Sequence, residues 1–262
     1  QGVYNNTQKG RYPMKQSVLE YKKLLEQEGL LVEFAEPEGK EGKDRPVTLV
    51  TYFSGGGDQG TLFLCKGATF KEAYLKDAVN RGAVAYVSEK KYEAGKEIPA
   101  LIVNDARKAQ FVLGEAFYDY PAKSLHVTAL TGTKGKTTTT YMVKSILEEV
   151  GIKVGLIGTI EAIIGDKSIP ANNTTPESYT IQKYFSEMVE EGCECVVMEV
   201  SSQGLKLDRT AGIPFEIGIF TNLGEDHIGP NEHKDFNEYK YCKSLLFKQC
   251  KIGIGNVDDK WF

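Results

Sequence analysis

The chain has 262 residues, which suits one large domain or two ordinary ones. Hydrophobic residues make up 41% and charged residues 26%, as in a soluble globular protein that buries a core. The formal net charge is −4, from 32 basic and 36 acidic residues, and no long basic stripe occurs, so nucleic acid is not an expected partner. No apolar run is long enough to span a bilayer, and no membrane association is expected.

The cysteines and the N-terminus indicate the compartment. The five cysteines are odd in number and form no C-x-x-C pair, which argues against a disulfide framework and a cysteine zinc site. A reducing, cytoplasmic location is the simplest expectation. Residues 1–13 are polar and lack both a signal-peptide core and an initiator methionine. We expect them to be a disordered extension that precedes a folded region beginning at Met14.

The first half of the chain alternates short strands with helices. Apolar spacing predicts helices over residues 14–29, 70–81 and 105–118. Short apolar runs predict strands over residues 47–53, 61–65, 83–88 and 100–103. A glycine-rich turn over residues 54–60 separates the first two strands. These elements predict a small mixed α/β domain over residues 14–121, with Pro121 at its boundary.

The second half has a stronger α/β pattern. Strands are predicted over residues 125–130, 153–160, 195–200, 215–223 and 251–255. Helices are predicted over residues 137–150, 175–192 and 235–247. Thr175 is a suitable N-cap for the middle helix, with Pro176 at its first helical position. Because these strands are almost continuously apolar and alternate with helices, they predict a second domain over residues 122–262 with a mainly parallel sheet.

A glycine-containing segment with two lysines lies between a predicted strand and a predicted helix. Its glycines let backbone N–H groups turn toward an anion, and the helix points its positive end at the same place. Lys136 would reach the β- and γ-phosphates of ATP, and Thr137 would place a hydroxyl on Mg²⁺. An ordinary glycine turn is the alternative, because Leu130 replaces the first glycine of the general pattern. The predicted ATP-binding residues are Gly132, Thr133, Lys134, Gly135, Lys136, Thr137 and Thr138.

This segment, T-G-T-x-G-K-T-T, resembles the loop of the Mur ligases, the ATP-dependent enzymes that add amino acids in peptidoglycan synthesis. The pair Thr137-Thr138 disfavours the related folylpolyglutamate synthases. Three further motifs resemble those of the UDP-N-acetylmuramoyl-tripeptide synthetases. They are N-T-T-P at residues 173–176, M-E-V-S-S with a following arginine at residues 198–209, and F-T-N-L with D-H and lysine at residues 220–243.

The resemblance implies a chemistry of two steps. The glutamyl carboxylate of the substrate attacks the γ-phosphate of ATP to form an acyl phosphate, and an incoming amine then displaces phosphate. Lys136, His227 and Lys243 are the implied catalytic residues, and Thr137, Glu199, His227 and Lys243 the implied Mg²⁺ ligands. Lys243 would carry a carbamate, which turns a cation into an anion. On the sequence alone, Lys243 could equally lie on a solvated helix face.

The resemblance also implies the acceptor site. Residues expected to contact a UDP-N-acetylmuramoyl dipeptide are Asn173, Thr174, Thr175, Ser201 and Arg209. Ser54, Ala68 and Thr69 would line the uridine pocket. Family members usually carry Asp-Ser-Arg where this chain has Phe53-Ser54-Gly55, so only Ser54 matches that motif.

The resemblance finally implies what the chain lacks. It stops at an N-V-D-D segment, residues 256–259, that resembles a motif inside the central domain of the family. We therefore expect a monomeric fragment, inactive alone, with an incomplete central domain and no determinants for the added amino acid, meso-diaminopimelate or L-lysine. Two alternatives stay open: a Mur-like ligase for another acid substrate, and a non-catalytic nucleotide-binding fragment.

Overall fold

The computed structural model describes residues 16–37, 44–67, 70–226, 228–230 and 232–261. The chain divides into two compact units, which are described separately. The first comprises residues 1–109 and 116–119, and the second comprises residues 110–115 and 120–262. The division falls within helix α3 (Ala106–Phe117), whose ends belong to the first unit. Among the described residues, no helix has both the length and the apolar character needed to cross a membrane.

The first unit is a five-stranded sheet in the order β1-β5-β4-β3-β2. Its strands are β1 (Leu31–Ala35), β2 (Leu49–Thr51), β3 (Thr61–Leu64), β4 (Ala83–Ser88) and β5 (Ala100–Val103). Strands β2 to β5 pair in parallel and β1 joins β5 antiparallel. Two helices accompany them, α1 (Val18–Gln27) and α2 (Glu72–Asn80), with 3-10 turns at Ser54–Gly56 and Glu93–Gly95.

Helix α1 begins at a capping box. The Ser17 hydroxyl accepts a hydrogen bond from Glu20 N at 3.2 Å, and the Glu20 carboxylate accepts one from Ser17 N at 2.7 Å. Two N–H groups that the helix itself cannot satisfy are thereby paired. The helix then buries Leu25 completely. The mixed α/β fold predicted for this region is confirmed, although strand β1 was not predicted.

The second unit is a seven-stranded sheet in the order β12-β11-β6-β10-β7-β8-β9. Its strands are β6 (His126–Thr131), β7 (Val154–Ile157), β8 (Glu161–Ile164), β9 (Lys167–Pro170), β10 (Cys195–Glu199), β11 (Phe215–Phe220) and β12 (Cys250–Gly255). The five strands from β12 to β7 are parallel, and β8 and β9 extend the sheet as an antiparallel hairpin. The predicted mainly parallel sheet is confirmed.

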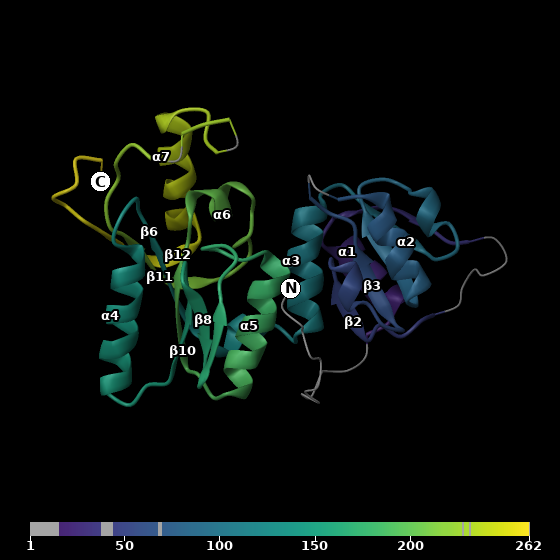
Figure 1. Cartoon of the computed structure of the whole chain (residues 1–262), viewed down its shortest axis with the longest axis horizontal. Coiled ribbons are helices and arrows are strands. Elements are labelled where there is room, and N and C mark those ends of the chain that lie inside the picture. Colours follow the sequence, from purple (N-terminus) through teal and green to yellow (C-terminus); the bar gives the residue numbers. More distant parts are fainter. Residues whose placement is uncertain (1–15, 38–43, 68–69, 227, 231, 262) are drawn as a thin grey trace. The chain divides into compact units, whose positions relative to one another are not determined.

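Two helices cover opposite faces of this sheet (Figure 1). Helix α4 (Lys136–Glu149) packs Val143 and Leu147 against Leu130 and Val197, whereas α5 (Ser178–Glu190) belongs to the cluster that contains Val196 and Met198. Consecutive residues of β10 therefore face different helices, as the pleat of a strand requires. Helices α6 (Ser202–Lys206) and α7 (Phe236–Ser244) follow β10 and β11, and 3-10 turns lie at Pro121–Ser124 and Leu245–Lys248.

One predicted helix start was wrong. Helix α5 begins at Ser178 with Glu177 as its N-cap, so Thr175 is not the cap and Pro176 is not the first helical residue. The Thr175 hydroxyl instead donates to Glu199 O at 3.1 Å and accepts from Ser201 N at 2.9 Å. Pro176 also disfavours helical backbone angles at the residue before it, Thr175, which agrees with a helix that begins later.

Candidate functional site

The predicted phosphate loop connects β6 to α4 at the carboxyl edge of the second sheet. The loop is fastened to residues 221–224, which follow β11. Thr133 N donates to Asn222 O at 2.9 Å, and Lys134 N donates to Asn222 Oδ1 at 2.9 Å. The Lys134 carbonyl accepts from Thr221 Oγ1 at 2.8 Å. The structure thus joins two motifs that lie about ninety residues apart in the sequence, at the edge where parallel sheets bind ligands.

Gly132 makes this close approach possible. Its φ is +144°, and a Cβ built there would lie 2.0 Å from Thr221 Oγ1. Gly135, with φ +83°, precedes the first helical residue, Lys136, and nothing lies within 4 Å of a Cβ placed on it. The two glycines therefore serve different needs: Gly132 provides space and Gly135 provides a left-handed turn.

Two lysines meet at the carbonyl of Gly132. Lys136 Nζ donates to Gly132 O at 2.9 Å, and Lys243 Nζ, from α7, donates to the same oxygen at 2.8 Å. Burial lowers the pKa of both amines, with the Lys136 charge as a further cause at Lys243. The pKa of Lys243 falls from 10.5 to about 7, so near neutral pH this amine is partly unprotonated. Lys243 is 2% exposed, which rules out the solvated helix face.

Tyr239 supports both the loop and Lys243. Its hydroxyl lies 3.0 Å from Thr133 Oγ1, and the Lys243 ammonium lies 4.8 Å from the centre of its ring. Tyr239 is fully buried and one helical turn before Lys243 on α7. The sequence reasoning missed this residue, although its position four residues before Lys243 on a predicted helix placed both side chains on one face.

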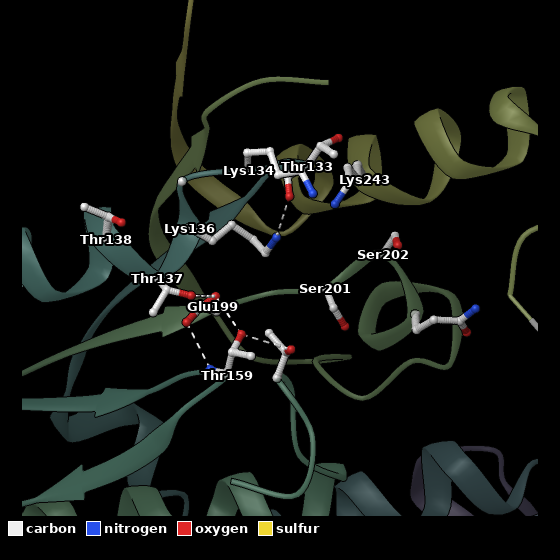
Figure 2. Close-up of a pocket in the computed structure, with 13 residues that line it drawn as sticks. Thr133, Lys134, Lys136, Thr137, Thr138, Thr159, Glu199, Ser201, Ser202 and Lys243 are labelled. Carbon is white, nitrogen blue, oxygen red and sulfur yellow. Dashed lines mark hydrogen bonds between the residues drawn. The ribbon is translucent and has the colours of Figure 1, made fainter. Parts of the chain in front are cut away.

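Glu199 ends strand β10 beside the loop and is fully buried. Its carboxylate accepts three hydrogen bonds, each at 3.0 Å: from Thr137 Oγ1, from Thr159 N and from Thr159 Oγ1 (Figure 2). These three hydrogen bonds fix the orientation of the carboxylate beside the loop. Thr159, in the connection between β7 and β8, is a second residue that the sequence reasoning missed.

These groups surround one cavity of about 450 Å³ (Figure 2). Lys136, Lys243 and Glu199 converge on it from the loop, α7 and β10. Its lining comprises Thr133, Lys134, Gly135, Lys136, Thr137, Thr138, Thr159, Thr174, Glu199, Ser201, Ser202, Gln203 and Lys243. The lining thus combines charged side chains with neutral hydroxyl and amide groups.

The predicted acceptor residues are divided between the lining and the layer behind it. Thr174 and Ser201 line the cavity, and Asn173 is exposed. Arg209 does not line it: its guanidinium donates to Thr175 O at 3.1 Å and pairs with Glu177 at 3.1 Å. A buried histidine, His233, lies behind the lining, with Nε2 2.9 Å from Ser202 Oγ. The sequence reasoning missed it because His233, unlike His227, is in none of the quoted motifs.

Several predicted residues have no described position. His227, Ala68 and Thr69 lie outside the described residues, and Ser54 lies in the 3-10 turn of the first unit with its side chain outside the described part. Among the side chains that the structure does place, no three His, Cys, Asp or Glu residues gather as potential metal ligands. Of the predicted Mg²⁺ ligands, those described with an oxygen donor are Thr137 and Glu199.

The second unit has a mainly parallel sheet, and a glycine-containing loop leads from one of its strands into a helix. With a lysine and an acid at that loop, these features define a P-loop α/β protein. Comparison with known proteins then identifies the family. The model of the Mur ligase middle domain matches residues 130–262, and the chain belongs to the Mur ligase family.

The relatives include ligases whose names contain different amino acids, 2,6-diaminopimelate or L-lysine. The chain is 47% identical over 205 residues to UDP-N-acetylmuramoyl-L-alanyl-D-glutamate–2,6-diaminopimelate ligase 1 of Clostridium acetobutylicum, covering 78% of this chain and 42% of the relative. It is 40% identical over 254 residues to the corresponding L-lysine ligase of Enterococcus faecalis, covering 94% of this chain and 50% of the relative. The chain spans about half the length of such relatives.

Solved structures share the fold. A UDP-N-acetylmuramoyl-L-alanyl-D-glutamate–2,6-diaminopimelate ligase superposes with a TM-score of 0.70 at 24% identity, covering 82% of this chain and 44% of that one. MurF from Acinetobacter baumannii superposes with a TM-score of 0.62 at 21% identity, covering 92% and 49%. At these identities the agreement concerns the fold alone.

Proposed function

We propose that this chain is the ATP- and acceptor-binding part of a ligase of peptidoglycan synthesis. In this proposal the ligase adds the third amino acid, meso-diaminopimelate or L-lysine, to UDP-N-acetylmuramoyl-L-alanyl-D-glutamate. The observation that carries the proposal is the convergence of the phosphate loop, Glu199, Thr174 and Lys243 on one cavity. Relatives named for each amino acid support both choices.

The charges at the cavity suit the joining of two anions. In the proposed reaction the glutamyl carboxylate attacks the γ-phosphorus of ATP, ADP leaves, and an acyl phosphate forms. The amine of the incoming amino acid then attacks the acyl carbon, and phosphate leaves. Lys136 would exchange the neutral carbonyl of Gly132 for a phosphate oxygen, since an anion is the stronger partner for an ammonium group.

Magnesium fits the oxygen groups of Thr137 and Glu199. Thr137 Oγ1 and the Glu199 carboxylate lie 3.0 Å apart, and Mg²⁺ prefers oxygen ligands. When bound, Mg²⁺ would neutralise part of the phosphate charge. His227 would be a further ligand in this proposal. The amine of Lys243 is no Mg²⁺ ligand until it becomes an anion.

The environment of Lys243 supports its proposed carbamylation. A carbamate forms when an unprotonated amine attacks CO₂, and the lowered pKa of Lys243 supplies that form near neutral pH. We expect the chain in ¹³C-bicarbonate to give a carbamate carbonyl signal that Lys243→Ala lacks. In the ligase of full length, Lys243→Ala should lose activity, with partial rescue by bicarbonate or a small acid. Wild-type turnover of that variant would contradict the role.

Neutral polar groups of the cavity would hold the acceptor. Thr174 and Ser201 present hydroxyl groups there, and Asn173 and Thr175 belong to the same segments. Arg209 would need to exchange Glu177 for a carboxylate or phosphate of the substrate. The uridine end is assigned to Ser54, Ala68 and Thr69 by resemblance only.

Calorimetric titration of the chain tests the proposal. Mg·ATP should bind, and Lys136→Met should abolish most of that binding because it removes a cation without shortening the side chain much. UDP-N-acetylmuramoyl-L-alanyl-D-glutamate should bind better than a folate or a poly-glutamate acid, and the opposite order would favour a ligase for another substrate. Phosphate release by this chain alone that requires both acceptor and amino acid would contradict our expectation that it cannot complete the ligation.

A further inference from the structure

The Glu199 carboxylate is held from two directions. Thr137 approaches from the phosphate loop, and Thr159 approaches from the connection between β7 and β8 with two donors, its N–H and its hydroxyl. Gly158 permits this approach, because a Cβ on it would lie 2.6 Å from Glu199 Oε1. All three donors are neutral groups, and together they fix the orientation of the carboxylate.

The hydroxyl of Thr159 has a second partner on the acceptor side. Its Oγ1 lies 3.1 Å from Thr174 Oγ1, in the segment that contains the N-T-T-P motif. Thr159 is therefore in contact with the acid beside the phosphate loop and with a residue of the predicted acceptor site. Thr159 itself is exposed and lies outside the apolar clusters, so its hydroxyl is not needed to fill the core.

We propose that Thr159 is a positioning residue: it orients the Glu199 carboxylate toward a divalent cation bound with the nucleotide. Through its hydroxyl it also connects Glu199 to Thr174. This inference rests on the proposed function. When a cation arrives, Thr137 can give up Glu199 and turn its hydroxyl oxygen to the metal, whereas Thr159 continues to hold the carboxylate. Residues that orient a metal ligand in this way change metal affinity by about 10-fold to 100-fold when they are removed.

Two substitutions separate the effect of the Thr159 hydroxyl from the effect of the shape of its side chain. Thr159→Val keeps the branched shape and the backbone N–H but removes both hydroxyl bonds, whereas Thr159→Ser keeps the hydroxyl. Mn²⁺ serves as the probe, with free Mn²⁺ measured by electron paramagnetic resonance during titration of the chain in saturating ADP. Nucleotide affinity is measured separately in EDTA.

We expect Thr159→Val to bind Mn²⁺ about 10-fold more weakly than the unsubstituted chain, and Thr159→Ser to bind it nearly as well. Nucleotide affinity in EDTA should be the same for all three. Unchanged Mn²⁺ binding by Thr159→Val would overturn the inference, as would equal weakening by both variants or a parallel loss in EDTA. Failure of the unsubstituted chain to bind nucleotide would instead overturn the proposed function, and this inference with it.

Discussion

Replacement of Gly132 by alanine tests the geometry on which the site depends. The φ of Gly132, +144°, lies far from the left-handed region, about +57°, that other residues occasionally adopt. The added Cβ would lie 2.0 Å from Thr221 Oγ1 and 3.1 Å from both N and O of Asn222. Thr221 cannot turn its hydroxyl away without losing its bond to the Lys134 carbonyl.

The magnitude follows from these two effects. A backbone conformation of this kind costs about 1–3 kcal/mol for a residue with a side chain. Overpacking by one methyl group against fixed neighbours costs about 1–3 kcal/mol more. We therefore expect Gly132→Ala to lower the free energy of unfolding of the second unit by about 3 kcal/mol. Gly135→Ala is the matched control, because it has a positive φ but no crowded Cβ, and should lose about 1 kcal/mol.

Trp261 provides the measurement. It is the one tryptophan of the sequence, and its ring centre lies 5.0 Å from that of Phe236 on α7, so its fluorescence reports the second unit. Denaturant titrations of the unsubstituted chain and both variants give the free energies. If Gly132→Ala loses no more stability than Gly135→Ala, the loop does not approach residues 221–222 as described, and the reasoning is refuted.

Three further predictions concern single contacts. Lys243→Met should stabilise the chain most below pH 7 and progressively less up to pH 10. Over that interval the unfolded chain binds more protons at Lys243 than the folded chain does, so the stability of the unsubstituted chain rises with pH. A pH-independent difference between the two chains in denaturant titrations would contradict the lowered pKa. Tyr239→Phe should cost about 1 kcal/mol in the same titrations, because Thr133 Oγ1 loses a partner. Ser17→Ala should cost about 1 kcal/mol by breaking the capping box, measured by circular dichroism, and no loss would contradict the cap.

The sequence predicted elements best where the signal is local. The loop before α4 and the strand ending at Glu199 have patterns contained within a few residues, and the structure agrees with them. Strand β1 was missed because its side chains lack the apolar alternation of a half-buried strand, and the β8–β9 hairpin because its outer strand is mostly exposed. The start of α5 was misplaced because the Thr175 hydroxyl bonds a distant segment and not its own helix.

The partners within the site were harder to predict for a related reason. Thr159 and Tyr239 are ordinary residues in their local sequence, and their importance comes from Glu199 and Thr133, which are 40 and 106 residues away. No local pattern contains such a pairing. The role of Lys243 was suggested by resemblance, but its burial and lowered pKa became visible only when α7 was placed against the loop.

The arrangement of charge explains why such pairings matter to the proposed reaction. Lys136 and Lys243 are hydrogen-bonded to a neutral carbonyl, and Glu199 is hydrogen-bonded to neutral hydroxyl and N–H groups. An arriving phosphate and cation would replace neutral partners and would not have to separate a buried ion pair, which costs several kcal/mol. The ion pair at the rim, Lys134 with Asp226, is largely exposed and worth about 1 kcal/mol or less. The Lys136 ammonium and the Glu199 carboxylate are therefore oriented before ligands arrive, which is the electrostatic condition for stabilising charge in the proposed phosphoryl transfer.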